Sequence, residues 1–397
     1  MREPTANLLQ EDGSVEKLYA IRPYSFISFF ANSLLPRLYS VFISMSPLPP
    51  ENTKQVTLAK IKRGPLGKVS PLINLFSSTS PGENTRLRLC TVGISHYCEK
   101  VRWGFDLLEN SGEEGGGFTY AEDAHPPGLS AIAVTEINSE RSGTPIVTDS
   151  ADGSVVYDSK NILRKYLPAL YPEDSQVGDE VRDFEEEMDR CLGPTARVFA
   201  YHHLLGEGNT DLLVDMATKD TSHIETFLFR QLALRGMIQP GMRRFMSVTP
   251  ESCEMSRTEI LRVFDSVGNR LENNGSGRYI IGDRFTAADL SFASLASPLL
   301  LNLREFEYLS CGRRDQFPRE LKEMSKRLMS TRAGEHVVEC YRKYRFGRLE
   351  GGRVVGAGVG TTKTTRQVKY KSAPRNRFGA MAMSAGAVVG LVGFAFK

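Results

Sequence analysis

The chain has 397 residues, too many for one compact core and enough for two domains with extensions. Its 41% hydrophobic and 24% charged residues are ordinary for a globular protein. The net charge of +3 is small and no basic run is interleaved with aromatic residues, so nucleic-acid binding is not expected. The six cysteines include no CxxC pair, which indicates a reducing compartment, and no metal site is expected.

Residues 1–84 are predicted to form an N-terminal extension and linker. Within them, residues 24–45 are rich in Phe, Leu and Ile but are interrupted by Pro36, which would kink any helix there. An interfacial segment and a helix packed on the domain are both compatible with this stretch. The acidic residues Glu3 and Glu11 argue against a cleaved signal or transit peptide.

A strand, a tight turn and a helix are predicted next. Residues 86–92 alternate polar and apolar side chains, and Gly93 ends this strand pattern. From Cys98 onward apolar residues recur at intervals of three and four, which indicates a helix, with Ser95 at its start. Ser95 is therefore expected at a helix N-terminus, where free backbone N–H groups and the helix dipole favour an anion.

A hairpin and a short helix complete the first half. Residues 118–121 are expected to form a second strand, and the β-branched runs 144–148 and 154–157 predict a β-hairpin. The following amphipathic helix ends before Pro168, and Ser159 is its expected N-cap.

The second half has helical periodicity. Val181, Phe184 and Met188 fall on one face of a helix whose other face is acidic. Further on, Thr286 and Asp289 have the spacing of a capping box, in which each side chain bonds to the other residue's backbone N–H.

Three stretches resemble the glutathione transferase family. The sequences VGISHYCEKVRWGFDLL and GTPIVTDSADGSVVYDSKNILRKYL resemble its N-terminal domain, and the second holds the TP[IV] turn and an Asp-Ser pair. The sequence RYIIGDRFTAADLSFASLA resembles the family's second signature. The resemblance implies an α/β thioredoxin-like, glutathione-binding domain over residues 85–170, followed by an all-α helical-bundle domain over 171–346.

The resemblance also implies glutathione as cofactor, whose thiolate attacks an electrophile. By comparison with members that carry SPYC at this turn, Ser95 would contact the sulfur of glutathione and Cys98 would occupy a second, more buried position. Ser95 either donates a hydrogen bond to the thiolate or only caps its helix. Cys98 either packs in the core or forms a mixed disulfide with glutathione. His96 departs from the proline common at its position.

The remaining contacts with glutathione are also implied by the resemblance. A cis peptide bond at Pro145 would turn the preceding backbone outward, and backbone groups before and after Pro145, including those of Ile146, would hold the cysteinyl part. Asp158 and Ser159 would hold the γ-glutamyl group, although a plain turn with an N-cap fits the same residues. A small apolar electrophile is expected between the domains, beside the helix that contains Arg197.

The C-terminal part is predicted to be a flexible basic linker, residues 347–377, and a transmembrane tail anchor, residues 378–396. The tail contains no charged residue and, at about 1.5 Å per residue, is long enough to cross a bilayer. Basic residues such as Lys369 and Arg375 precede it and favour a cytosolic position for the rest of the chain. A flexible tail of Gly and Ala is the alternative.

Three functions stay open at this point. The first is an enzyme that conjugates glutathione to an apolar electrophile at a membrane surface, which the intact TP[IV] turn favours. The second is a non-catalytic, membrane-tethered binding protein similar to metaxins, which the tail and His96 favour. The third is a glutathione-dependent thiol–disulfide oxidoreductase that uses Cys98. A homodimer is compatible with the family resemblance, and the sequence does not identify the membrane.

Overall fold

The computed structural model describes residues 86–357 except 113–117, 138–142, 276 and 301–313. The predicted extension at 1–84 and the predicted tail at 378–396 therefore lie outside the described residues. Among the residues that are described, no helix is long and apolar enough to cross a membrane.

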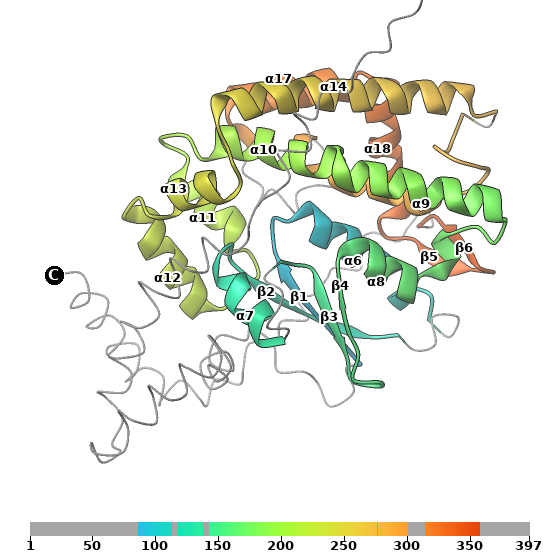
Figure 1. Cartoon of the computed structure of the whole chain (residues 1–397), viewed down its shortest axis with the longest axis horizontal. Helices are drawn as coiled ribbons and strands as arrows, with labels where there is room; N and C mark the ends of the chain where they lie inside the picture. The colour runs from blue at the N-terminus through green and yellow to red at the C-terminus, as the bar shows by residue number, and fades with distance from the viewer. Residues whose placement is uncertain (1–85, 113–117, 138–142, 276, 301–313, 358–397) are drawn as a thin grey trace, which may run out of the picture.

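The first part of the chain is a four-stranded sheet with helices on its faces (Figure 1). Its strands are ordered β2-β1-β3-β4, with β1 parallel to β2 and antiparallel to β3, and β3 antiparallel to β4. This arrangement is thioredoxin-like, as predicted. In chain order the elements are β1 (Leu87–Val92), α6 (His96–Glu109), β2 (Tyr120–His125), α7 (Leu129–Ile137), β3 (Ile146–Asp149), β4 (Val155–Tyr157) and α8 (Ser159–Tyr166).

The second part is helical, which confirms the predicted order of an α/β unit followed by an all-α unit. Its elements are η2 (Pro168–Leu170), α9 (Ser175–Arg190), α10 (Leu192–Leu204), α11 (Thr210–Ala217), α12 (His223–Leu234), α13 (Ile238–Phe245), α14 (Pro250–Asn273), α15 (Ala287–Ala296), η3 (Ser297–Leu299), η5 (Arg314–Gln316), α17 (Arg319–Met329) and α18 (Arg332–Tyr344). The predicted capping box is confirmed: Thr286 caps α15, and the Asp289 carboxylate accepts from the Thr286 N–H at 3.0 Å.

A hairpin follows the last helix and corrects part of the linker prediction. Strands β5 (Arg348–Glu350) and β6 (Arg353–Val355) fall within residues 347–377, which the sequence analysis assigns to a flexible linker. The hairpin is attached to the end of α6. The side chain of Asn110 donates to the Gly347 carbonyl at 3.0 Å, and the Leu349 N–H donates to the Ser111 hydroxyl at 2.7 Å. These contacts come from residues more than 200 positions away, which local sequence patterns do not reveal.

Helix α6 lies between the sheet and the helical unit and is buried along nearly its whole length (Figure 1). Its apolar residues pack on both sides. Phe105 packs edge-to-face against the rings of Tyr120 and Tyr166, and the Trp103 ring packs in a tilted arrangement against Tyr341 of α18. The helix is thus the common core of the two parts of the chain.

The charged residues of α6 are buried as well. The Lys100 ammonium, with no exposed surface, contacts Glu185 at 2.9 Å and Asp189 at 3.0 Å, both on α9. Burial alone would lower the pKa of Lys100, but these two carboxylates outweigh it and raise that pKa. Lys100 therefore stays protonated and joins the sheet unit to the helical unit through buried ion pairs.

The end of α18 makes a second buried connection to α6. The Arg345 guanidinium contacts Glu99 at 2.6 Å and Asp106 at 2.7 Å. Arg102, one turn along α6, contacts Glu122 of β2 at 2.5 Å. Because an unpaired buried charge is costly, these pairs constrain how α6 can sit between its neighbours.

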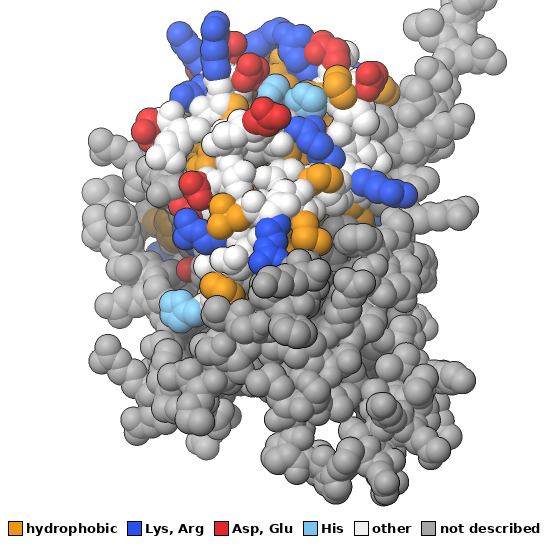
Figure 2. Space-filling view, turned by 90° about the vertical axis from the view of Figure 1, so that its left-hand side faces the viewer, with side chains coloured by type: hydrophobic (Ala, Val, Ile, Leu, Met, Phe, Trp, Pro, Cys, Tyr) orange, Lys and Arg blue, Asp and Glu red, His pale blue; other side chains and the backbone are white. Residues whose placement is uncertain are grey.

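The face formed around α11, α12 and α13 has a different character. Figure 2 shows apolar and basic side chains mixed on the described part of this face. Phe227 and Leu234 of α12 are among its exposed apolar residues. Apolar residues scattered among charges in this way are normal for a protein surface.

Breaking the central ion pairs should destabilise the fold. We expect Lys100→Met to lower the free energy of unfolding by about 3–5 kcal/mol, because it leaves Asp189 without its cation and Glu185 with only Arg164 as a partner. Urea denaturation measures this change. The matched control is Lys165→Met, whose side chain is 37% exposed and pairs with Asp152, and its effect should be much smaller. Equal losses in the two variants would contradict this account of α6.

Candidate functional site

The register of the sheet brings the predicted site residues to one edge. Cys90 of β1 pairs with Ile146 of β3, and Ile146 pairs with Tyr157 of β4. Because these three residues lie side by side, the segments that follow β1, precede β3 and follow β4 emerge at the same edge. These segments carry Ser95, Cys98, Pro145, Asp158 and Ser159.

Ser95 occupies the predicted helix N-terminus. It is the N-cap of α6, it is partly exposed, and its Oγ accepts from the Cys98 N–H at 3.4 Å. Its own N–H donates to the Val92 carbonyl at 3.0 Å, which closes the turn after β1. Because Oγ is the acceptor in the capping bond, the hydroxyl hydrogen stays available as a donor to an anion at the helix N-terminus.

Cys98 lies one turn into the helix and has no exposed surface. Burial raises the pKa of its thiol, although the Arg102 charge and hydrogen bonding with Ser95 and Thr144 act in the opposite direction. The thiol is therefore protonated at neutral pH and shielded from solvent. This favours the core-packing interpretation of Cys98.

The turn before β3 contains the predicted proline. The Thr144–Pro145 peptide bond is cis, as predicted. Ile146 is fully buried between Cys90 and Tyr157, so it lies inside the sheet. Thr144 is partly exposed, and among the described residues neither its N–H nor its C=O pairs with another backbone group. Thr144 is thus the backbone available to a ligand. This agrees with the expectation that the cis bond turns the preceding backbone outward, although the sequence analysis named Ile146 as the residue that holds the cysteinyl part.

The turn after β4 differs by one residue from its prediction. Asp158 is the N-cap of α8, and Ser159, expected there, is the first helical residue and only 3% exposed. Asp158 has a φ of 66°, a left-handed conformation that Asp adopts more readily than most residues. The Asp158 side chain is exposed and makes no capping hydrogen bond. It also makes no ion pair with the described residues, so its carboxylate is available to a cationic group.

Helix α10 faces this edge from the helical unit. The ring Nε2 of His96 donates to the Gly193 carbonyl at 2.8 Å, and His96 is 4% exposed. Burial, followed by the charge of Arg197, lowers the pKa of His96 to about 3. His96 is therefore neutral at physiological pH and cannot take up a proton there.

Arg197 brings a positive charge to the same place. Its Nε is buried and, among the described residues, has no hydrogen-bond partner. Tyr201 lies one turn further along α10. Burial raises the pKa of the Tyr201 hydroxyl, which is therefore a neutral donor. The N-terminus of α6 and the Arg197 guanidinium together make this region favourable for an anion such as a thiolate.

No family model matches the chain, and no curated protein matches it. Among solved structures, a glutathione S-transferase from Methylobacterium radiotolerans in complex with glutathione sulfonate is 21% identical, covers 64% of this chain and 95% of its own, and has a TM-score of 0.36. Ure2p in complex with glutathione is 15% identical, with 68% and 99% covered and a TM-score of 0.39. The β-etherase LigF from Sphingobium is 17% identical, with 64% and 99% covered and a TM-score of 0.39. At these values the fold assignment rests on this chain's own strand and helix order.

The lowered pKa of His96 predicts a pH effect on stability. Between about pH 3 and pH 6.5 the unfolded chain binds a proton at His96 that the folded chain does not bind. The contribution of His96 to stability is therefore full above pH 6.5 and is lost as the pH falls toward 3, by at most about 1.4 kcal/mol per pH unit. His96→Gln keeps a donor for the Gly193 carbonyl and removes the titration. Its free energy of unfolding, measured with urea across this range, should fall less steeply than that of the wild type, and parallel curves would contradict the inference.

Proposed function

We propose that this chain is a glutathione transferase-like enzyme that conjugates glutathione to an apolar electrophile at a membrane surface. The observation that carries the proposal is the convergence at one sheet edge of three groups that can still make hydrogen bonds or ion pairs to a ligand. They are the Ser95 hydroxyl, the backbone of Thr144 and the Asp158 carboxylate. A hydroxyl, a strand-like backbone and a carboxylate suit the thiol, the peptide groups and the ammonium of glutathione.

The residues present fit the tripeptide. Thr144 would pair with the cysteinyl peptide groups as an added strand would. Asp158 would accept from the γ-glutamyl ammonium, and the N–H groups at the start of α8, beside Ser159, would bind the γ-glutamyl carboxylate. The bound tripeptide supplies the nucleophilic sulfur of the reaction.

Ser95 would promote the reaction by stabilising negative charge on that sulfur. A hydroxyl donor, the N-terminus of α6 and the Arg197 guanidinium all favour the thiolate over the thiol and so lower the pKa of the thiol. His96 has no part as a base, since its pKa of about 3 keeps it from accepting the proton. The proton therefore leaves to solvent, and the activation is electrostatic.

The oxidoreductase alternative receives less support. It needs a thiolate at Cys98 that glutathione disulfide can reach, but Cys98 has no exposed surface and burial raises its pKa. The non-catalytic alternative is distinguished from the enzyme by measuring whether the chain binds glutathione.

We expect Ser95→Ala to reduce kcat/KM for conjugation by about 10- to 100-fold, the loss of one hydrogen bond to a charged atom. With glutathione saturating and the electrophile varied, the pH dependence of kcat/KM for the electrophile should also shift upward, because the thiol of bound glutathione would have a higher pKa. Cys98→Ser is the matched control and should keep the activity. Conjugation with a chromogenic aryl halide measures both effects.

The opposite pattern, with activity lost in Cys98→Ser and kept in Ser95→Ala, would favour the oxidoreductase. Calorimetry with glutathione tests the third possibility, a non-catalytic binding protein. A folded chain without detectable glutathione binding would exclude the enzyme and leave the membrane-tethered binding protein. Binding that weakens in Ser159→Ala would indicate an intact site even before an electrophile is known.

The membrane location is a second part of the proposal and depends on the tail at 378–396. We expect removal of residues 378–397 to release the chain into the soluble fraction, because the uncharged tail is long enough to cross a bilayer. The measurement is an alkaline carbonate wash of membranes from cells that express the full or shortened chain. A shortened chain that stays with the membranes would show that the tail is not the anchor.

A further inference from the structure

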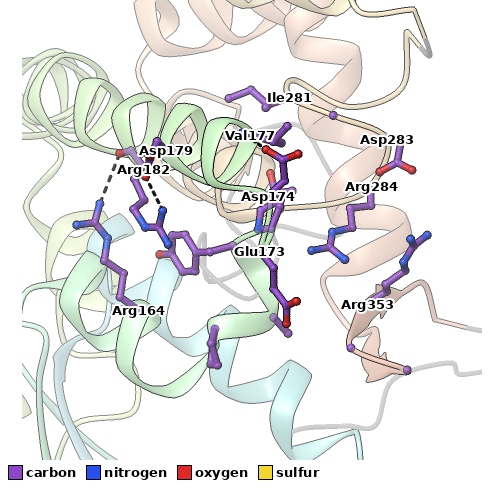
Figure 3. A pocket seen from close by; sticks show the side chains of 18 of the residues that line it. Arg164, Glu173, Asp174, Val177, Asp179, Arg182, Ile281, Asp283, Arg284 and Arg353 are labelled. Carbon is purple, nitrogen blue, oxygen red and sulfur yellow. Dashed lines mark hydrogen bonds and ion pairs between the residues drawn. The ribbon is translucent and has the colours of Figure 1, made fainter.

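A large cleft lies away from the sheet edge that carries Ser95. It has a volume of about 1350 Å³ and is formed by the 168–174 connection, the start of α9, the turn before α15 and the tip of the β5–β6 hairpin (Figure 3). Pockets for single small molecules are usually about 300–1,000 Å³. The cleft is therefore large enough for a peptide.

Two of the four arginines that line the cleft are neutralised by the protein itself. Arg164 contacts Glu185 and Glu186 at 3.2 Å each, and Arg182 contacts Asp179 at 2.9 Å. These pairs form one end of the cleft, and their charges are already balanced.

The other two arginines are not neutralised. Arg284 is partly buried and Arg353 is exposed, and neither makes a hydrogen bond or an ion pair within the described part of the chain. The turn that carries Arg284 is held in place, because the Asn274 side chain donates to the Gly282 carbonyl at 2.9 Å and Gly282 has a φ of 72°. A bulkier residue would be strained in this left-handed conformation.

The facing wall is acidic. Figure 3 shows Arg284 and Arg353, with Asp283 beside them, on one side of the cleft and Glu173 and Asp174 on the other, with the Arg284 side chain directed across it. Glu173 is exposed and has no ion-pair partner among the described residues. Asp174 accepts the Gln176 and Val177 N–H groups at the start of α9 but likewise has no cation within ion-pair distance. The cleft thus has two arginines without an ion pair, beside the single carboxylate Asp283, opposite a wall with two carboxylates without an ion pair.

We propose that this cleft binds a short zwitterionic peptide, with its carboxylate on Arg284 and Arg353 and its ammonium toward Glu173 and Asp174. Guanidinium groups bind carboxylates through paired hydrogen bonds. A polyanion such as a nucleotide would be repelled by the acidic wall, and a polycation by the basic one. A ligand that carries one charge of each sign satisfies both walls, and the volume suits a peptide of a few residues.

The test uses tri-alanine, N-acetyl-tri-alanine and tri-alanine amide, titrated into the full chain by calorimetry. Tri-alanine carries no thiol, so the result is independent of the proposed conjugation. Tri-alanine should bind saturably, and Arg284→Gln and Arg353→Gln should each weaken its binding about tenfold. For the amide, which has no carboxylate, the same substitutions should change little, since the partner of the arginine is already missing.

The acidic wall is tested in the same way. Glu173→Gln should weaken the binding of tri-alanine but not that of the N-acetyl form, which has no ammonium. Arg182→Gln is the matched control within the cleft, because Asp179 already neutralises Arg182, and Arg257→Gln on α14 is the control outside it. Thermal unfolding establishes that each variant is folded. Absence of saturable tri-alanine binding, or equal binding by the wild type and the Arg284 and Arg353 variants, would overturn the proposal.

Discussion

The burial of charge along α6 is the constraint on which the rest of the structure depends. This helix carries Lys100, Arg102 and Glu99 into the interior, where each is stabilised only if its partner from another element is in place. Those partners come from α9, β2 and the end of α18, so α6 can occupy one position between the two units. The position of α6 in turn places Ser95, its N-cap, where the sheet edge meets α10.

This constraint decides which polar residues near Ser95 can take part in chemistry. The same burial that secures α6 makes His96 neutral and keeps the Cys98 thiol protonated and out of reach. Two residues that would be reactive on a surface therefore serve packing. The groups left for a ligand lie at the margins of the buried region: a capping hydroxyl at Ser95, a turn backbone at Thr144 and a guanidinium at Arg197.

Local patterns predicted the parts of the fold that local physics decides. The Ser95 N-cap and the capping box at Thr286 follow from hydrogen bonds between residues three apart, so a short stretch of sequence contains both partners. The burial of Lys100 was not predictable, because a lysine on a helix usually faces solvent and its partners lie on α9, more than 80 residues away. The β5–β6 hairpin was missed for the same reason: its glycine-rich sequence is typical of a linker, and contacts with the end of α6 hold it.

Helix α8 connects the two regions where ligands are proposed, since it begins at the sheet edge with Ser159 and carries Arg164 to the peptide cleft. A ligand at one region could influence the other through α8 only if the helix shifted. Arg164 opposes such a shift, because it is paired with two carboxylates of α9, the helix that also holds Lys100. The network of ion pairs that fixes α6 therefore also fixes α8. Because α8 cannot shift, binding of a ligand at one region should not change the affinity of the other region for its ligand.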